Sequence, residues 1–369
     1  MSDFNLTARV GSDKFPICIS SSSLEQFLSY IDNYKPENIA FIIDSFFEDT
    51  AKLPSSSFGN YVKNSNAFFL DGGLESKGLE TYSNIIDWLI DKKIPRDGLL
   101  VGVGGGVVVD ITAFVASTYQ RGINLIHIPT TTTAMIDSSV GGKTGLNYAN
   151  QVNLIGTYHN PSAIFMDPRF LLSLNMRDYT SGICEAIKMS VTSDKDFFTY
   201  LLNNSNALLN FNLETMTSLV HWSVLTKLRH VCDDAKEKSI RLILNYGHTF
   251  GQSIETYYGL FQDHLRHGEA VGLGMIVAGA LADAINKNKG INENIMDQSL
   301  KAIQLFNLPT TLDPDIGRPP LEVLVNNLIN DKKRTSQGNR FILCSKIGNA
   351  NVEYINEIDM IKKSFSAIY

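Results

Sequence analysis

The sequence lacks an excess of basic residues. Its 32 lysines and arginines are outnumbered by 38 aspartates and glutamates, which gives a formal net charge of −6 at pH 7. Nucleic-acid binding depends on a basic face that neutralises phosphates, so this balance argues against a nucleic-acid partner. A local basic pocket for a small anion remains compatible with it.

Cysteine is also scarce. The sequence has only four, and no two of them form a CxxC pair: Cys18, Cys184, Cys232 and Cys344. This spacing excludes a disulfide framework and a cysteine zinc site, and it suits a reducing compartment.

Targeting and membrane signals are missing as well. The first residues, MSDFNLTARV, lack the basic start and apolar stretch of a signal peptide. No apolar run approaches the ~20 residues that span a bilayer, and there are no repeats or low-complexity tracts. With 369 residues, 44% hydrophobic and 19% charged, we expect a globular, cytoplasmic chain of two domains.

The first half of the chain alternates apolar runs of strand length with helical patterns. Runs at 38–44, 99–103 and 124–128 are long enough for strands buried on both faces, and an apolar stripe between Leu79 and Ile90 predicts a helix. This rhythm is typical of a parallel sheet with crossover helices. After residue 174 helical periodicity dominates, so the sequence predicts an α/β domain over 1–174 and a helical domain over 175–369.

Several polar or glycine-rich segments follow the predicted strands, where ligands bind in open α/β sheets. Gly104, Gly105 and Gly106 end one strand just before a helix, which favours a phosphate site approached by their backbone amides over a simple tight turn. Asp44 closes another strand and could bond a ribose hydroxyl or merely solvate a loop. Four threonines, Thr130 to Thr133, follow the end of a third predicted strand.

Histidines are concentrated in one stretch. Three of the seven, His248, His264 and His267, fall between residues 245 and 271 at two predicted helix starts. A catalytic zinc site needs three protein ligands and an open position. Glu185 lies among apolar residues and needs a partner, which makes it the third candidate ligand. Taken by themselves, the histidines are slightly better explained as ordinary polar helix-terminal residues.

The motifs taken together resemble 3-dehydroquinate synthase and the wider sugar phosphate cyclase family. They follow the family's order through most of the chain from residue 71 onward. The matching segments are GGGVVVD (104–110), STYQRG (117–122), IPTT (128–131), DSSVGGKTG (137–145), NLIG (153–156), CEAIK (184–188), LNYGHTFG (244–251) and HGEAV (267–271).

The resemblance implies a Rossmann-like α/β NAD-binding domain, an all-α C-terminal metal-binding domain and a homodimer. It implies zinc or cobalt held by Glu185, His248 and His267, and an Arg121 that reaches the neighbouring subunit. The substrate-binding residues it implies are Asp137, Lys143, Asn153, Lys188, Lys227, Arg241, Asn245, Gln252 and one of Lys332 and Lys333. Those implied for NAD are Asp44, Glu75, Lys77, Gly104, Gly105, Gly106, Val107, Asp110, Thr130, Thr131 and Lys143.

The implied activity converts 3-deoxy-D-arabino-heptulosonate 7-phosphate to 3-dehydroquinate and phosphate, using NAD transiently. Three positions depart from the family pattern. Gln252 stands where a second histidine is usual, Val152 replaces a lysine near the cofactor, and Glu75 is displaced by one residue. Glutamine can hydrogen-bond a substrate oxygen, but it cannot shuttle a proton near neutral pH.

Three other functions are compatible with parts of the sequence. A sister cyclase acting on another sugar phosphate is favoured by Gln252 and Val152, but the retained Arg241 and Asn245 argue against it. A glycerol-dehydrogenase-like oxidoreductase shares the GGG and PTT elements, yet it would carry a TGSE-like segment in place of VGGKTG. A non-catalytic NAD- or metal-binding paralogue is the third, and the intact set of Glu185, His248, His267 and Lys143 argues against it.

Overall fold

The computed structural model describes residues 3–149, 151–259, 264–329 and 339–369. The chain divides into two compact units, each described by itself. The first comprises Met1–Asn175 and Phe211–Lys236, and the second comprises Met176–Asn210 and Glu237–Tyr369. Helix α7 (Leu213–Val231) therefore groups with the first unit, whose strands β1 and β2 it contacts.

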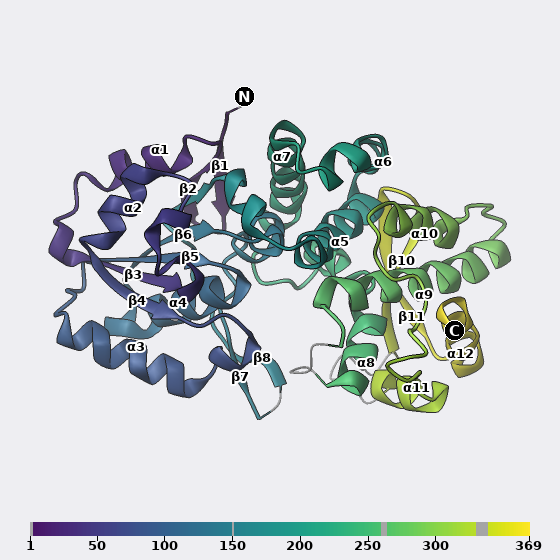
Figure 1. The fold of residues 1–369 in the computed structure, drawn as a ribbon. Helices are drawn as coiled ribbons and strands as arrows, with labels where there is room; N and C mark the ends of the chain where they lie inside the picture. Colours follow the sequence, from purple (N-terminus) through teal and green to yellow (C-terminus); the bar gives the residue numbers. More distant parts are fainter. Residues whose placement is uncertain (1–2, 150, 260–263, 330–338) are drawn as a thin grey trace. The chain divides into compact units, whose positions relative to one another are not determined.

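The first unit is built on a seven-stranded sheet in the order β1-β2-β9-β6-β5-β3-β4 (Figure 1). The β1–β2 hairpin is antiparallel, and every other neighbouring pair is parallel. The strands are β1 (Phe4–Val10), β2 (Asp13–Ile19), β3 (Ile39–Asp44), β4 (Asn66–Leu70), β5 (Leu99–Gly104), β6 (Asn124–Pro129) and β9 (Ala163–Met166). A separate ribbon pairs β7 (Leu146–Tyr148) with β8 (Gln151–Ile155).

Helices cover both faces of this sheet, because its strands carry apolar side chains on both sides. They are α1 (Ser23–Ile31), α2 (Ser56–Lys63), α3 (Leu79–Asp91) and α4 (Gly106–Thr118). On β3, Phe41 meets Phe27 of α1 and Phe58 of α2 edge to face. Its neighbours Ala40 and Ile42 point the other way, into a core shared with α3 and α4.

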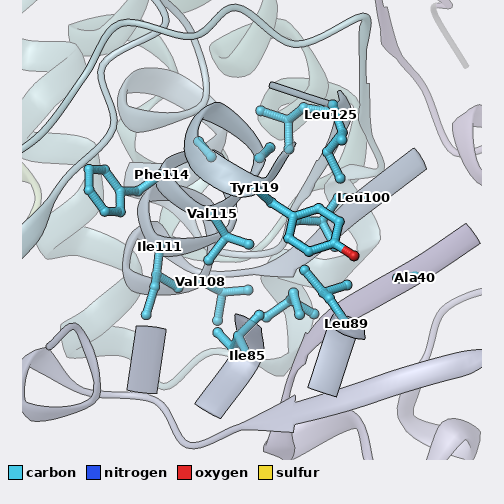
Figure 2. Packing of buried hydrophobic residues seen from close by; sticks show 14 of the residues in the cluster. Ala40, Ile85, Leu89, Leu100, Val108, Ile111, Phe114, Val115, Tyr119 and Leu125 are labelled. Carbon is cyan, nitrogen blue, oxygen red and sulfur yellow. The ribbon is translucent and has the colours of Figure 1, made fainter. Parts of the chain in front are cut away.

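Figure 2 shows this second core from close by. Ile85 and Leu89 of α3 lie against Val108, Ile111 and other apolar side chains of α4, with the sheet behind them. Burial of apolar area on this scale, at ~25 cal/mol per Å², is the main force that holds α4 and its N-terminus against the sheet.

The second unit is mostly helical. Its helices are α5 (Met176–Ser193), α6 (Lys195–Leu209), α8 (His248–Tyr258), α9 (His267–Asn288), α10 (Ile295–Leu305), α11 (Leu321–Ile329) and α12 (Ile358–Phe365). A ribbon of β10 (Asn339–Lys346) and β11 (Asn349–Ile355) completes it.

Helix α9 is the centre of this unit. It packs against α5, α8, α10, α12 and β10. Among the described residues it is the one helix long and apolar enough to cross a bilayer, but 78% of its apolar window is buried inside the protein. The same composition is expected of a core helix that is apolar on all sides.

Candidate functional site

The carboxyl end of the first unit's sheet gathers the residues predicted to bind NAD. The chain runs from β3 to the edge strand β4 and returns to β5 on the other side of β3, so the strand order reverses between β3 and β5. Ligands bind at such a switch point in open α/β sheets. Asp44 ends β3 and Gly104 ends the adjacent β5, next to the start of α4 at Gly106. Thr130 follows β6, and its N–H donates to the Gly104 carbonyl at 2.9 Å.

The glycines at this turn are required by close packing. A Cβ on Gly104 would lie 2.6 Å from Val108 Cβ, and one on Gly105 would lie 3.0 Å from Thr131 Cγ2. Gly106 is the first residue of α4, so its amide is among those left without a helical partner. These amides, together with the positive end of the helix, suit a phosphate group.

Lys77 and Asp110 form an ion pair nearby in the same unit. Their Nζ and Oδ2 atoms lie 2.5 Å apart, and Lys77 Nζ also donates to the side-chain oxygen of Asn153. Burial raises the pKa of Asp110, while the Lys77 ammonium opposes that rise. Asn147 connects these segments because its side chain donates to the Leu74 carbonyl at 2.9 Å and accepts from the Asn153 N–H.

Asp137 and Lys227 come together across the first unit from distant parts of the chain. Lys227 of α7 is 5% exposed, and its Nζ lies 2.8 Å from Asp137 Oδ1. Lys143 is exposed, as are Glu75 and Asn153. Arg121 precedes β6, so it lies at the amino end of the strands. Thr130 and Thr131 follow β6 and lie at the opposite, carboxyl end.

In the second unit Glu185, His248 and His267 converge. Each offers one ligand atom, and these atoms all lie within 4.8 Å of one another. Glu185 comes from the middle of α5, whereas His248 and His267 are the first residues of α8 and α9. The Nε2 atoms of both histidines lie 3.5 Å from Glu185 Oε1.

The chemistry of this cluster fits a divalent metal. Both oxygens of Glu185 are buried, and neither accepts a hydrogen bond of normal geometry from a described residue, although Lys188 Nζ lies 2.5 Å from Oε2. Such a carboxylate is costly to bury unless a cation compensates it. One carboxylate and two imidazoles make a donor set that zinc and cobalt accept, with a position left open for substrate.

The protonation states also suit metal binding. Burial opposes ionisation of Glu185, but the Lys188 ammonium and the two imidazoles outweigh it and hold the pKa of this carboxyl well below its usual range. Burial lowers the pKa of His248 to about 3, so its ring is neutral at pH 7. Burial acts in the same direction on His267, but the Glu255 and Glu185 carboxylates outweigh it and raise the pKa of His267 well above 6.5.

Two further groups contact the histidines of this candidate ligand set. His248 Nδ1 lies 3.2 Å from the Tyr246 carbonyl, and His267 Nδ1 lies 2.8 Å from Glu255 Oε1. Ligating histidines usually bond their second nitrogen in this way, which fixes the ring orientation. Glu255 was not predicted from the sequence, although its place two turns after His248 on one helix would have indicated it.

The remaining predicted residues of this unit flank the cluster in sequence. Arg241 is buried, and Asn245 ends the same short 3₁₀ helix, Ile240–Asn245, just before α8. The Asn245 amide donates to Glu237 Oε1 at 2.5 Å. Glu237 was not predicted from the sequence. Gln252 is exposed one turn after His248, and Lys332 and Lys333 lie outside the described residues.

Comparisons with known proteins agree with this architecture. Family models described as 3-dehydroquinate synthase N-terminal and C-terminal match residues 67–181 and 182–334. The 3-dehydroquinate synthase of Prochlorococcus marinus (strain AS9601) is 37% identical over 327 residues, which is 86% of this chain and 87% of that protein. The one from Dictyoglomus thermophilum (strain ATCC 35947 / DSM 3960 / H-6-12) is 36% identical over 362 residues, 97% of this chain and 96% of that protein.

A solved structure shares the fold at lower identity. The crystal structure of 2-deoxy-scyllo-inosose synthase, complexed with carbaglucose-6-phosphate, NAD+ and Co2+, superposes with a TM-score of 0.83 at 24% identity, covering 98% of this chain and 99% of that chain. At this identity the likeness establishes the fold. The identity to the curated relatives goes further, and the chain belongs to the 3-dehydroquinate synthase family.

Proposed function

We propose that the protein converts 3-deoxy-D-arabino-heptulosonate 7-phosphate to 3-dehydroquinate and phosphate, as a carbon–oxygen lyase that uses NAD transiently and a divalent metal. The observation that carries this proposal is the convergence of Glu185, His248 and His267 in a chain of this family. When bound, the metal would polarise a substrate oxygen, and NAD would accept a hydride and give it back.

The residues of the second unit are assigned roles that fit their environments. Glu185, His248 and His267 hold the metal, and Glu255 orients His267. Lys188 and Arg241, both buried cations, bind the anionic groups of the substrate. Asn245 and Gln252 bind substrate oxygens, and one of Lys332 and Lys333 adds a further cation. Groups positioned in this way hold the substrate in a reactive geometry.

The residues of the first unit are assigned mainly to NAD. The amides from Gly104 to Val107 receive the pyrophosphate, and Asp44 bonds a ribose hydroxyl. The other NAD contacts are Glu75, Lys77, Asp110, Thr130, Thr131 and Lys143. Asp137, Asn153 and Lys227, together with Lys143, are assigned to the substrate. A homodimer in which Arg121 reaches the neighbouring subunit remains a prediction from the family resemblance. A cytoplasmic location remains a prediction from the sequence.

A sister cyclase activity on a different sugar phosphate is the second candidate. Gln252 favours it, because the proton-carrying histidine usual at that position is replaced by a residue without an acid–base function near pH 7. The retained Arg241 and Asn245 favour the heptulosonate phosphate.

One assay separates the two candidates. The purified protein is loaded with zinc and NAD and offered the heptulosonate phosphate or glucose 6-phosphate in parallel reactions. We expect phosphate release with the first sugar only, accompanied by 3-dehydroquinate identified by mass spectrometry. Phosphate release from glucose 6-phosphate alone would show that the sister-cyclase proposal is the correct one.

A further inference from the structure

His267 depends for its position on the start of the helix that carries it. It is the first residue of α9, so the place where α9 begins decides whether its ring can reach Glu185. Glu255 then fixes the orientation of the ring through its contact with Nδ1.

The start of α9 is bound to the start of α5 by two crossed ion pairs. Arg177 of α5 donates from Nε and an Nη to the two carboxylate oxygens of Glu269, at 2.7 and 2.8 Å. Arg266, just before α9, donates from Nε to Asp178 of α5 at 2.6 Å. A two-point arginine–carboxylate bond fixes geometry as well as distance.

Glu269 also caps the helix it belongs to. Its Oε2 accepts from the Arg266 N–H at 2.8 Å, which satisfies one of the amides that a helix start leaves without a partner. Arg177 therefore holds the carboxylate that defines where α9 begins. Arg177 also donates to the His264 carbonyl at 3.0 Å, so it binds the chain before the helix as well.

The two helices are in backbone contact at the same place. The Gly268 N–H donates to Ser181 Oγ at 3.1 Å, and a Cβ on Gly268 would lie 1.9 Å from the Ser181 carbonyl oxygen. Ser181 precedes Glu185 by one turn of α5, so both lie on the same face. The helix that supplies the carboxylate ligand thus also fixes the helix that supplies the imidazole.

We propose that Arg177 and Glu269, together with Arg266 and Asp178, are positioning residues that set the spacing between Glu185 and His267 for metal binding. This inference rests on the metal role assigned to those two residues under the proposed function. None of the four is among the residues assigned to the metal or the substrate, and they act through the register of α9 on α5.

The test uses the full-length protein stripped of metal and titrated with Co2+ against a competing chelator. Arg177→Gln and Glu269→Gln should each weaken Co2+ affinity about tenfold, the lower end of the range for groups that orient metal ligands. The double variant should bind no more weakly than either single one, because both lose the same contact. Arg177→Lys, which keeps the charge but not the two-point bond, should fall between wild type and Arg177→Gln.

Two further readouts separate positioning from general stability. The visible absorption bands of the Co2+ form should shift in Arg177→Gln, because the ligand geometry changes. The melting temperature of the metal-free protein should change no more than in the control Lys289→Gln, which removes an exposed ion pair with Glu353 in the same unit and should bind Co2+ like wild type. Wild-type affinity and spectrum in Arg177→Gln, or an equal loss in Lys289→Gln, would overturn the inference.

The inference and the proposed function can fail separately. Co2+ binding that depends on His248 but not on Arg177 would contradict the positioning role and leave the proposed function intact. Co2+ binding that depends on Arg177, in a protein that releases no phosphate from the heptulosonate phosphate, would support the positioning role and contradict the proposed function.

Discussion

Glu255 and His267 form a carboxylate–imidazole pair behind the candidate metal position. Their contact of 2.8 Å contributes to a pKa of His267 well above 6.5, so the ring carries a proton at pH 7 when no metal is bound. His248, with a pKa of about 3, is already neutral, and Glu185 is already ionised. Of the three ligands, only His267 must lose a proton before it can bind a cation.

Metal binding at pH 7 is therefore predicted to release about one proton. The raised pKa of His267 sets the direction of the pH dependence. At pH values below this pKa, metal affinity should fall about tenfold for each unit by which the pH is lowered, and above this pKa it should level off. Calorimetric titration with Zn2+ in buffers of different ionisation enthalpy measures the number of protons. Glu255→Gln should release fewer protons at pH 7, because it removes a carboxylate that favours the charged ring. Release of no proton by the wild type would contradict the raised pKa of His267 in the metal-free protein.

Gln252 lies one turn beyond His248 on α8 and departs from the family pattern. If it orients the substrate only by hydrogen bonds, Gln252→Ala should lower the rate of 3-dehydroquinate formation, and Gln252→His should raise it only modestly. A lost general acid or base would typically cost ~10²–10⁴-fold. Steady-state kinetics of the three proteins at matched zinc and NAD measure the difference. A wild type that makes no 3-dehydroquinate, beside a Gln252→His variant that does, would support the sister cyclase.

At the scale of elements, local sequence was enough to predict three adjacent strands in the first unit's sheet. The buried runs at 38–44, 99–103 and 124–128 correspond to β3, β5 and β6, and the two predicted helix starts at His248 and His267 are confirmed. The ribbon of β7 and β8 was not predicted, because both strands are short and the side chains of β8 are largely exposed. The pairing of Arg177 with Glu269 joins residues 92 positions apart, which no local pattern indicates.

The turn between β5 and α4 gives a prediction for NAD binding. Gly105→Ala should weaken NAD affinity, because the new Cβ lies 3.0 Å from Thr131 Cγ2, and Gly105→Val should weaken it further. Thr131→Ser removes that methyl group and keeps the hydroxyl, so the double variant Gly105→Ala, Thr131→Ser should recover part of the loss. Calorimetry with NAD measures each affinity. Co2+ affinity serves as the control and should stay unchanged, because the candidate metal residues belong to the other unit. Equal NAD affinity in Gly105→Val and wild type would argue against a phosphate site at this turn.

At the scale of the whole molecule, two ligands are assigned to two units that fold around separate cores. The metal residues belong to the second unit, and the glycine turn and Asp44 belong to the first. Ligand binding stabilises the folded protein by RT ln(1 + [L]/Kd), which is about 2.7 kcal/mol when the ligand concentration is 100 times Kd. Local opening free energies should therefore respond to each ligand in a different part of the chain.

Hydrogen exchange followed by mass spectrometry tests this expectation. Zn2+ should slow exchange at the starts of α8 and α9 and in the middle of α5, whereas NAD should slow it at the end of β5 and the first turn of α4. His248→Ala should abolish the zinc effect and keep the NAD effect. Zinc protection spread equally over the first unit's sheet would contradict the assignment of separate binding residues.

The chain enters the second unit at Met176, returns to the first at Phe211 and leaves it again at Glu237. During synthesis the ribosome therefore releases α5 and α6 before the first unit has received α7, its last helix. Nearly all of α5 is buried in the finished molecule, and α9, one of the helices that cover it, is made much later. A nascent chain paused between residues 210 and 266 would expose the side chains of α5 that α9 later covers, so we expect chaperone binding to be strongest in that interval.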